Sequence, residues 1–163
     1  MKTLYLVRHA KSSWDEEGLP DEERPITPKG IKKTLRVIAF LKDRDIKIGR
    51  ILSSHAVRAR ETARLLALGL KYPEKQILID RKIYDGYYDR ILDVIYGSPD
   101  EIDSMMIVGH NPTITQLANL FLHPGIESLP TSAVVCLSFD TGKWKEIPST
   151  DGKQEFIYHG KKE

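Results

Sequence analysis

Short apolar runs alternate with longer amphipathic segments along this chain. The first run, Leu4–Val7, has four apolar residues in a row and is followed by the charged pair Arg8 and His9. A short continuous apolar run of this kind is typical of a strand that is buried on both faces, as in a parallel sheet. Open α/β sheets build their ligand sites at the carboxyl ends of their strands. We therefore expect the charged pair to lie in such a site.

Later apolar runs predict further strands in the second and third quarters of the chain and near its end. These strands are expected over 50–54, 76–80, 105–108 and 133–139. A turn signal at 140–143 predicts that 144–147 returns as an antiparallel edge strand. The polar residues 151–163 are expected to be held loosely.

Segments with helical spacing of apolar residues lie between the predicted strands. The first helix is expected to begin after Thr27, an N-cap residue, with Pro28 at the first helical position. The predicted helices cover 28–43, 55–70, 88–96 and 113–122, and Tyr84–Gly86 is expected to form a loop. This alternation predicts a single α/β domain over residues 1–163, with a mostly parallel sheet between two layers of helices.

Composition and charge are those of an ordinary globular protein. The 163 residues are 40% hydrophobic and 29% charged, and 25 basic residues nearly balance 23 acidic ones. This balance does not support binding to nucleic acid or to a membrane surface. The one cysteine, Cys136, lies in an apolar run and is expected to be buried. No run is long enough to span a bilayer, and no secretory signal opens the chain, so we expect a cytoplasmic protein. We also expect a monomer or a weak oligomer.

Polar side chains follow three of the predicted strands at the points where these end. Arg8 and His9 follow the first strand, the second runs through Ser53–His55 to Arg58, and His110 follows the fourth. If these strands are neighbours, two arginines and two histidines meet at one edge of the sheet, beside two helix N-termini that favour an anion. Arginine presents paired N–H donors to phosphate oxygens. The pattern therefore predicts a pocket for a phosphoryl group.

Histidine can itself serve as the covalent nucleophile in phosphoryl transfer. The chain has no Walker A pattern, no cysteine-based phosphatase loop and no acidic or histidine cluster with metal-ligand spacing, so we predict a reaction without metal or cofactor. His9 must be neutral to attack, and the charges of Arg8 and Arg58 lower the pKa of an imidazole. His110 would contact the phosphoryl oxygens. Asp85, which follows the third strand, is the candidate proton donor to the leaving group.

Four segments carry a resemblance to a known family. Leu6–Ala10 resembles the Arg-His-Gly signature of the histidine phosphatase superfamily, which includes cofactor-dependent phosphoglycerate mutases and acid phosphatases. Ile26–Gly30 is similar to its Leu-Thr-x-x-Gly helix start, Ser53–Ala63 to its Ser-x-x-x-Arg-Ala-x-x-Thr-Ala segment, and Val108–Pro112 to its second-histidine segment. The variant Arg-His-Ala-Lys-Ser in so short a chain resembles the SixA-type phosphohistidine phosphatases.

The resemblance implies a phosphoglycerate mutase-like fold, a three-layer α/β/α sandwich. It implies that His9 is the nucleophile that becomes phosphorylated. The residues that it implies bind the phosphoryl group are Arg8, Arg58 and His110. Asp85 falls where many members have a glutamate as the acid donor, and its side chain is shorter.

Other positions near the signature differ from the family or stay open. Ala10 replaces the usual glycine, and His55 stands where many members have proline. Lys11 and Ser12 are candidate contacts to the phosphate. Lys11–Arg24 is the one sizeable loop, and the other segments between motifs are short. The resemblance therefore implies an open pocket, without the long insertions that cap the pocket in larger members.

An open pocket would admit a phosphorylated side chain of another protein. A phosphoramidate such as phosphohistidine leaves easily once its ring nitrogen is protonated, so a weak or missing acid is tolerable. We therefore hypothesise a protein phosphohistidine phosphatase, with a phosphorylated protein or a small phosphorylated molecule as its partner. Two enzyme alternatives are a small-molecule phosphomonoesterase and a mutase, although a mutase needs a closed pocket. The third alternative is a non-catalytic module that binds phosphoproteins.

Overall fold

One mixed sheet forms the centre of the computed structural model, which describes residues 1–14 and 18–161. Within these residues its six strands lie in the order β3-β2-β4-β1-β5-β6. The strands are β1 (Lys2–Arg8), β2 (Arg50–Ser53), β3 (Leu78–Ile79), β4 (Ser104–Gly109), β5 (Val134–Phe139) and β6 (Lys153–Tyr158). The strands β3, β2, β4 and β1 run parallel, whereas β5 pairs antiparallel with β1, and β6 antiparallel with β5.

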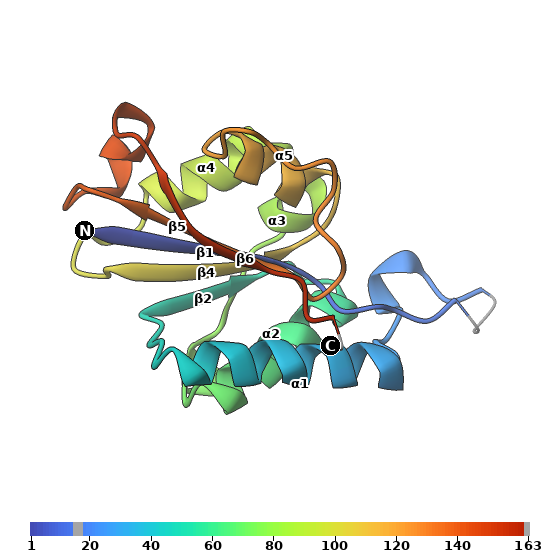
Figure 1. Ribbon diagram of the computed structural model, residues 1–163. Coiled ribbons are helices and arrows are strands. Elements are labelled where there is room, and N and C mark those ends of the chain that lie inside the picture. Colours follow the sequence, from blue (N-terminus) through green and yellow to red (C-terminus); the bar gives the residue numbers. More distant parts are fainter. Residues whose placement is uncertain (15–17, 162–163) are drawn as a thin grey trace.

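Helices cover both faces of the sheet (Figure 1). On one face lie α1 (Pro28–Asp43) and α2 (Val57–Gly69). On the other lie α3 (Lys82–Asp85), α4 (Tyr88–Tyr96) and α5 (Thr113–Asn119). Short 3₁₀ turns are η1 (Asp21–Glu23), η2 (Glu74–Gln76) and η3 (Trp144–Ser149). The predicted α/β fold with helices on both faces is confirmed.

Strand β1 shows why the sheet needs both helical layers. Its side chains alternate between the two faces, as the pleat of a strand requires. Leu4 and Leu6 pack in the core beneath α4 and α5, while Tyr5 and Val7 pack in the core beneath α1 and α2. All four are nearly or fully buried. This is the reason that the run Leu4–Val7 is apolar without interruption.

The register of the central strands brings the charged strand ends together. Arg8, the last residue of β1, lies opposite Gly109 of β4, and Ser53 at the end of β2 lies opposite Val108. β1, β4 and β2 are therefore adjacent, and the residues that follow each of them reach the same edge of the sheet. The three strands are thus neighbours, as the predicted pocket requires.

The C-terminal part of the chain corrects the predicted topology. Residues 144–147 form the turn η3 instead of an edge strand. Trp144 and Ile147, three positions apart, are both fully buried, which a 3₁₀ turn allows and an alternating strand does not. The edge strand is instead β6 (Lys153–Tyr158), in the segment expected to be held loosely. Residues 162–163 of that segment lie outside the described residues.

The described part of the connection from β1 to α1 is held in place by contacts near both of its ends. Residues 15–17 of this predicted loop lie outside the described residues. Ser12 forms an antiparallel bridge with Ile26, and the Thr27 side chain accepts the N–H of Gly30, which confirms the predicted N-cap. A Cβ at Gly30 would lie 2.7 Å from the carbonyl oxygen of Lys11. Glycine is thus required for this close approach of the loop to α1.

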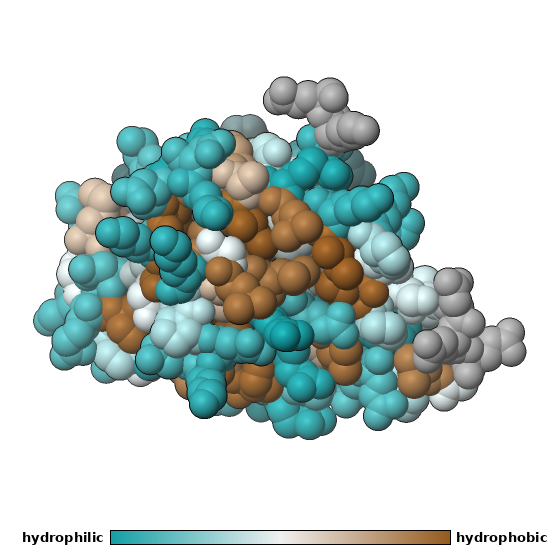
Figure 2. Space-filling model, turned by 90° about the horizontal axis from the view of Figure 1, so that it is seen from below, coloured by the Kyte–Doolittle hydropathy of each residue, from teal (hydrophilic) through white to brown (hydrophobic). Residues whose placement is uncertain are grey.

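The face that carries α1 and α2 has an apolar surface region, seen in the view from below (Figure 2). Exposed apolar side chains on these helices include Ile31, Leu35 and Leu68. No helix in the described part of the chain is both long and apolar enough to cross a membrane.

Candidate active site

A cavity of about 370 Å³ lies at the carboxyl edge of the sheet. It brings together six predicted residues, Arg8, His9, Lys11, Ser12, Arg58 and His110. The other residues that line it are Trp14, Arg24, Asn111 and Thr131. Asp85 is not among them.

His9 is held in one tautomer by its own backbone. Its Nδ1 lies 2.7 Å from the carbonyl oxygen of Ala10, and a carbonyl oxygen can only accept. Nδ1 therefore carries the proton and donates it, and Nε2 keeps its lone pair. The backbone N–H of His9 donates to the carbonyl oxygen of Gly109, which joins the residue to the end of β4. The ring is fixed with a nucleophilic nitrogen available.

The surroundings of His9 keep the imidazole neutral. Its pKa is lowered to about 4, chiefly by burial and also by the nearby charges of Arg58, Arg8 and Arg24, whereas the hydrogen bond to Ala10 acts in the opposite direction. A neutral imidazole is the form that can attack phosphorus. At pH 7 His9 thus has the protonation state that a nucleophile needs.

His110 faces His9, with 5.0 Å between the ring centroids. Its Nε2 lies 2.7 Å from Ser54 Oγ, which already accepts the N–H of Ala56. The Ser54 hydroxyl can therefore donate to Nε2, and the proton of the neutral ring then lies on Nδ1. That nitrogen is buried and has no hydrogen-bond partner among the described residues. Burial also lowers the pKa of His110, to about 3. His110 is arranged as a neutral hydrogen-bond donor.

Arg8 and Arg58 both retain unused donors. Arg8 donates from Nη1 to the carbonyl oxygen of Leu129 at 3.1 Å, and Arg58 donates from its two terminal nitrogens to Asp21. The Nε of each arginine is buried and has no partner among the described residues. Beyond these buried groups, the terminal nitrogens of the two arginines that line the cavity carry more N–H groups than the described residues use, as the binding of an anion requires.

Thr62 joins the helix that carries Arg58 to the segment that carries His9. Its hydroxyl donates to the carbonyl oxygen of Arg58 at 2.7 Å and accepts the N–H of Ala10 at 2.9 Å. Thr62 is fully buried. One buried threonine thus fixes the start of α2 relative to the residue after the nucleophile.

The structure does not bring Asp85 to the cavity. Its side chain is exposed, and its Oδ2 lies 3.9 Å from Nε of Arg81. Asp85 is the last residue of α3 instead of part of a loop. The preceding residue, Tyr84, packs against the ring of His110 with the centroids 5.2 Å apart. The role of Asp85 as proton donor stays a prediction.

Of the lining residues, the sequence did not predict Arg24, Trp14, Asn111 and Thr131, and it also missed Asp21, which contacts the wall from outside the cavity. Arg24 is buried, donates to Ser12 Oγ at 2.6 Å and stacks on the ring of Trp14 at 3.6 Å. Asp21 accepts hydrogen bonds from Arg24, Arg58 and Tyr84. The only sequence signal was an acid and a base three positions apart in a charged loop, which is common on protein surfaces.

We expect the free energy of unfolding to fall by about 2 kcal/mol between pH 7 and pH 5 on account of His9 alone. In the unfolded chain histidine binds a proton near its ordinary pKa, while folded His9 stays neutral down to about pH 4. The unfolded state thus binds more protons, so stability decreases as the pH decreases. Urea unfolding at both pH values measures the change. The expectation fails if the variant His9→Gln shows the same decrease as the wild type.

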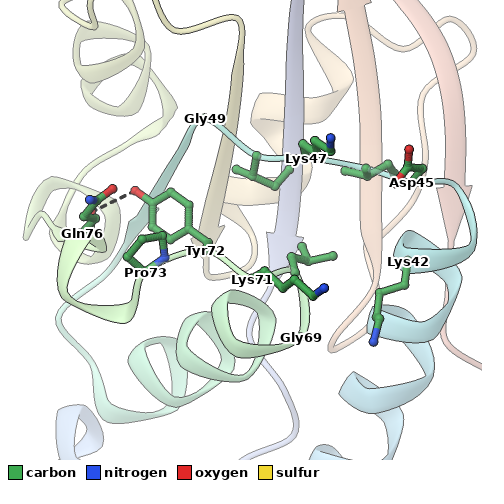
Figure 3. Close-up of a pocket in the computed structure, with 12 residues that line it drawn as sticks. Lys42, Asp45, Lys47, Gly49, Gly69, Lys71, Tyr72, Pro73 and Gln76 are labelled. Atoms are coloured by element: carbon green, nitrogen blue, oxygen red, sulfur yellow. Dashed lines mark hydrogen bonds between the residues drawn. The ribbon is translucent and has the colours of Figure 1, made fainter.

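A larger cavity, of about 530 Å³, lies at the C-terminal ends of α1 and α2 (Figure 3). It is lined by Lys42, Lys47 and Lys71 among others, and Tyr72 donates to the carbonyl oxygen of Gln76 there. None of the predicted site residues lines it. Its lysines are exposed, and the described part of this cavity contains no histidine or cysteine.

The fold and the cavity define a class, that of α/β proteins with a histidine-centred anion pocket at the sheet edge. The family model of the histidine phosphatase superfamily (branch 1) matches residues 4–85. The chain belongs to this superfamily. The resemblance read from the four sequence segments is confirmed at the level of the family.

Similar proteins cover nearly the whole chain. A provisionally assigned phosphohistidine phosphatase SixA from Agrobacterium tumefaciens is 25% identical, with a TM-score of 0.79 over 96% of this chain and 97% of that one. The protein histidine phosphatase SixA complexed with tungstate is 21% identical, with a TM-score of 0.78 over 97% of each chain. An uncharacterised protein from Mycobacterium leprae is 28% identical over 86% of this chain and 91% of its own. The fold is that of the SixA-type structures.

Proposed function

We propose that the protein is a phosphohistidine phosphatase, acting through a phosphorylated His9 without a metal ion. Arg8, Arg58 and His110 bind the phosphoryl group. Lys11 and Ser12 are further contacts at the wall of the cavity. We also propose that residues 1–163 act as one domain, because β6 belongs to the same sheet as the strand that leads to His9.

The observation that carries the substrate class is the chemistry of the cavity wall. Among the described residues that line it there is no carboxylic acid. The carboxylate that pairs with Arg58, Asp21, has a pKa held well below its usual range by hydrogen bonds from Tyr84, Arg58 and Arg24, which outweigh the opposite effect of burial. It is therefore a poor acid. An ester oxygen needs a proton from such an acid as it leaves, whereas an imidazole that is already protonated does not.

The reaction proceeds in two displacements. In the first, the lone pair of His9 Nε2 forms a bond to phosphorus, the P–N bond of the substrate breaks, and the substrate imidazole leaves with its electron pair and the proton on its ring. In the second, water attacks phosphorus, the P–Nε2 bond breaks, and inorganic phosphate is released with the proton of the water passing to solvent. The side chains of Arg8 and Arg58 neutralise the charge on the equatorial oxygens in both steps.

The surface around the cavity supports a protein as the carrier of the phosphoryl group. Trp14, which lines the cavity, is 76% exposed, and Lys11 beside it is exposed as well. The mouth of the cavity thus lies at the protein surface, where a side chain of another protein can enter. The similar structure of SixA bound to tungstate, a tetrahedral oxyanion like phosphate, supports the same ligand chemistry.

We expect the protein to hydrolyse a phosphohistidine protein at least tenfold faster, by kcat/KM, than an alkyl phosphate ester such as phosphoserine, and to do so equally well in EDTA, because the cavity wall lacks an acid to protonate an alkoxide leaving group. A histidine-containing protein labelled by phosphoramidate serves as the substrate, with release of inorganic phosphate as the readout. The proposal is rejected if the protein hydrolyses the ester well but leaves the phosphohistidine protein intact. That result would favour a small-molecule phosphomonoesterase. Binding of phosphate without any turnover would identify a non-catalytic module.

A further inference from the structure

Asp21 connects three side chains beside the cavity. Its Oδ1 accepts from Nε and Nη2 of Arg24, at 3.1 and 2.9 Å. Its Oδ2 accepts from Nη2 of Arg58 at 2.9 Å and from the hydroxyl of Tyr84 at 2.7 Å. Its main-chain oxygen accepts from Nη1 of Arg58 at 2.6 Å. One residue thus holds the outer edge of the Arg58 guanidinium through both terminal nitrogens.

The position of Asp21 separates its role from that of a ligand contact. Arg58 and Arg24 line the cavity, but neither Asp21 nor Tyr84 does. The carboxylate therefore holds the arginine from outside the space that a phosphoryl group would fill. Two of the five N–H groups of Arg58 go to Asp21, and Nε is buried, so each terminal nitrogen keeps one further N–H for a ligand.

Arg24 has fewer free N–H groups than Arg58. Its Nε and Nη2 are used by Asp21, and its Nη1 donates to Ser12 Oγ and to the carbonyl oxygen of Ser13. Four of its five N–H groups are therefore engaged, against two for Arg58. Arg24 is buried and stacked on Trp14. It is a fixed support for Asp21, and Arg58 is the arginine that keeps free donors.

We propose that Asp21 is a positioning residue, which holds the Arg58 guanidinium in its phosphoryl-binding orientation before the substrate arrives. The proposal rests on the assignment of Arg58 to phosphoryl binding in the proposed function. An arginine side chain has many rotamers, and fixing its fork in advance removes an ordering cost from ligand binding. Tyr84 and Arg24 share the task by holding Asp21 itself. The negative charge of Asp21 thus serves to orient Arg58.

Binding of tungstate, measured by titration calorimetry, tests the proposal without requiring turnover. Asp21→Asn is expected to weaken tungstate binding about tenfold or more, because charge-assisted hydrogen bonds to Arg58 and Arg24 are lost. Glu74→Gln is the matched control, since it removes a carboxylate that pairs with an exposed arginine of α2, Arg64, away from the cavity. Its affinity should equal that of the wild type. Tighter binding in Asp21→Asn would show that Asp21 competes with the anion, and unchanged binding would show that it does not position Arg58; either overturns the proposal.

Two further variants make the test specific. In an Arg58→Ala background, Asp21→Asn is expected to cause no additional loss of affinity; a second full loss would mean that Asp21 acts independently of Arg58 and would reject the proposal. Tyr84→Phe removes one hydroxyl and keeps the ring, so it should fold even if Asp21→Asn does not, and it should weaken binding by a few-fold in the same direction. Tungstate binding without phosphohistidine turnover would refute the proposed function alone, while a wild type that binds no tungstate would refute both.

Discussion

Replacing His9 by alanine is expected to abolish turnover, with kcat/KM for a phosphohistidine protein lowered by about 10⁴-fold or more, as is usual when a covalent nucleophile is removed. The geometry gives the reason. His9 Nδ1 is engaged with the carbonyl oxygen of Ala10, so Nε2 is the one ring nitrogen left to form the bond to phosphorus. His110, the other histidine of the cavity, has its Nε2 engaged with Ser54 and cannot replace it without repacking.

The measurement is a rapid quench after incubation with ³²P-labelled phosphohistidine protein. Wild type should carry a label that is lost in acid and stable in alkali, as a phosphoramidate is, and His9→Ala should carry none. His159→Ala is the matched control, because His159 is exposed and lies outside the cavity, and it should retain label and turnover. A label that persists in His9→Ala, or turnover near the wild-type rate, would disprove the assignment of the nucleophile.

Most residues that line the cavity could be predicted to lie together because they stand at or just after the end of a buried strand. An uninterrupted apolar run is recognisable in a sequence. A charged residue directly at its end cannot belong to the apolar core, so a role in a ligand site is favoured. Arg8, His9 and His110 were found in this way, and Arg58 from its place in the first turn of the following helix. The parallel register of β1, β4 and β2 then brings these strand ends together. Here local pattern and tertiary structure agree.

The parts that could not be predicted depend on contacts distant in sequence. Trp144 was assigned to a strand, but its indole donates to the carbonyl oxygen of Ile102 and it is buried in a turn. β6 has three exposed polar residues at its start, so its pattern gave no sign that it pairs with β5. The position of Asp21 depends on Arg58, 37 residues away, and on Tyr84, 63 residues away. The local periodicity of apolar and polar residues in the sequence does not indicate such distant contacts.

Asp85 and its neighbour Tyr84 face different directions, which the sequence does not indicate. The sequence placed an acid after the third strand, where the resemblance implied a proton donor. In the structure the short helix α3 turns Tyr84 towards His55 and His110, with T-shaped ring contacts, and leaves Asp85 exposed. A helical turn separates the directions of neighbouring side chains by about 100°, so the two residues cannot both face the site. The sequence position after the third strand correctly indicated a segment near the cavity. The direction of each side chain in the helical turn determines that Tyr84, and not Asp85, approaches it.

Arg58→Ala is expected to lower kcat/KM about 30- to 1,000-fold, which corresponds to about 2–4 kcal/mol of lost transition-state stabilisation. Arg58 is 6% exposed, lines the cavity, and is fixed by Asp21 through one N–H of each terminal nitrogen, so a second N–H on each stays unused by Asp21. Its charges and donors are therefore preorganised around the place where negative charge must be bound. Arg58→Lys keeps the charge but loses the planar fork, so we expect it to recover only a small part of the loss.

A matched helix variant separates this effect from a general loss of positive charge. Arg64→Ala, on the same helix, removes an exposed arginine that pairs with Glu74, and its kcat/KM should stay within about twofold of the wild type because surface ion pairs contribute little. Arg58→Ala should also shift the acid limb of the pH–rate profile to higher pH, because the charge of Arg58 contributes to the lowered pKa of His9. Equal losses in Arg58→Ala and Arg64→Ala would contradict a specific phosphoryl-binding role for Arg58.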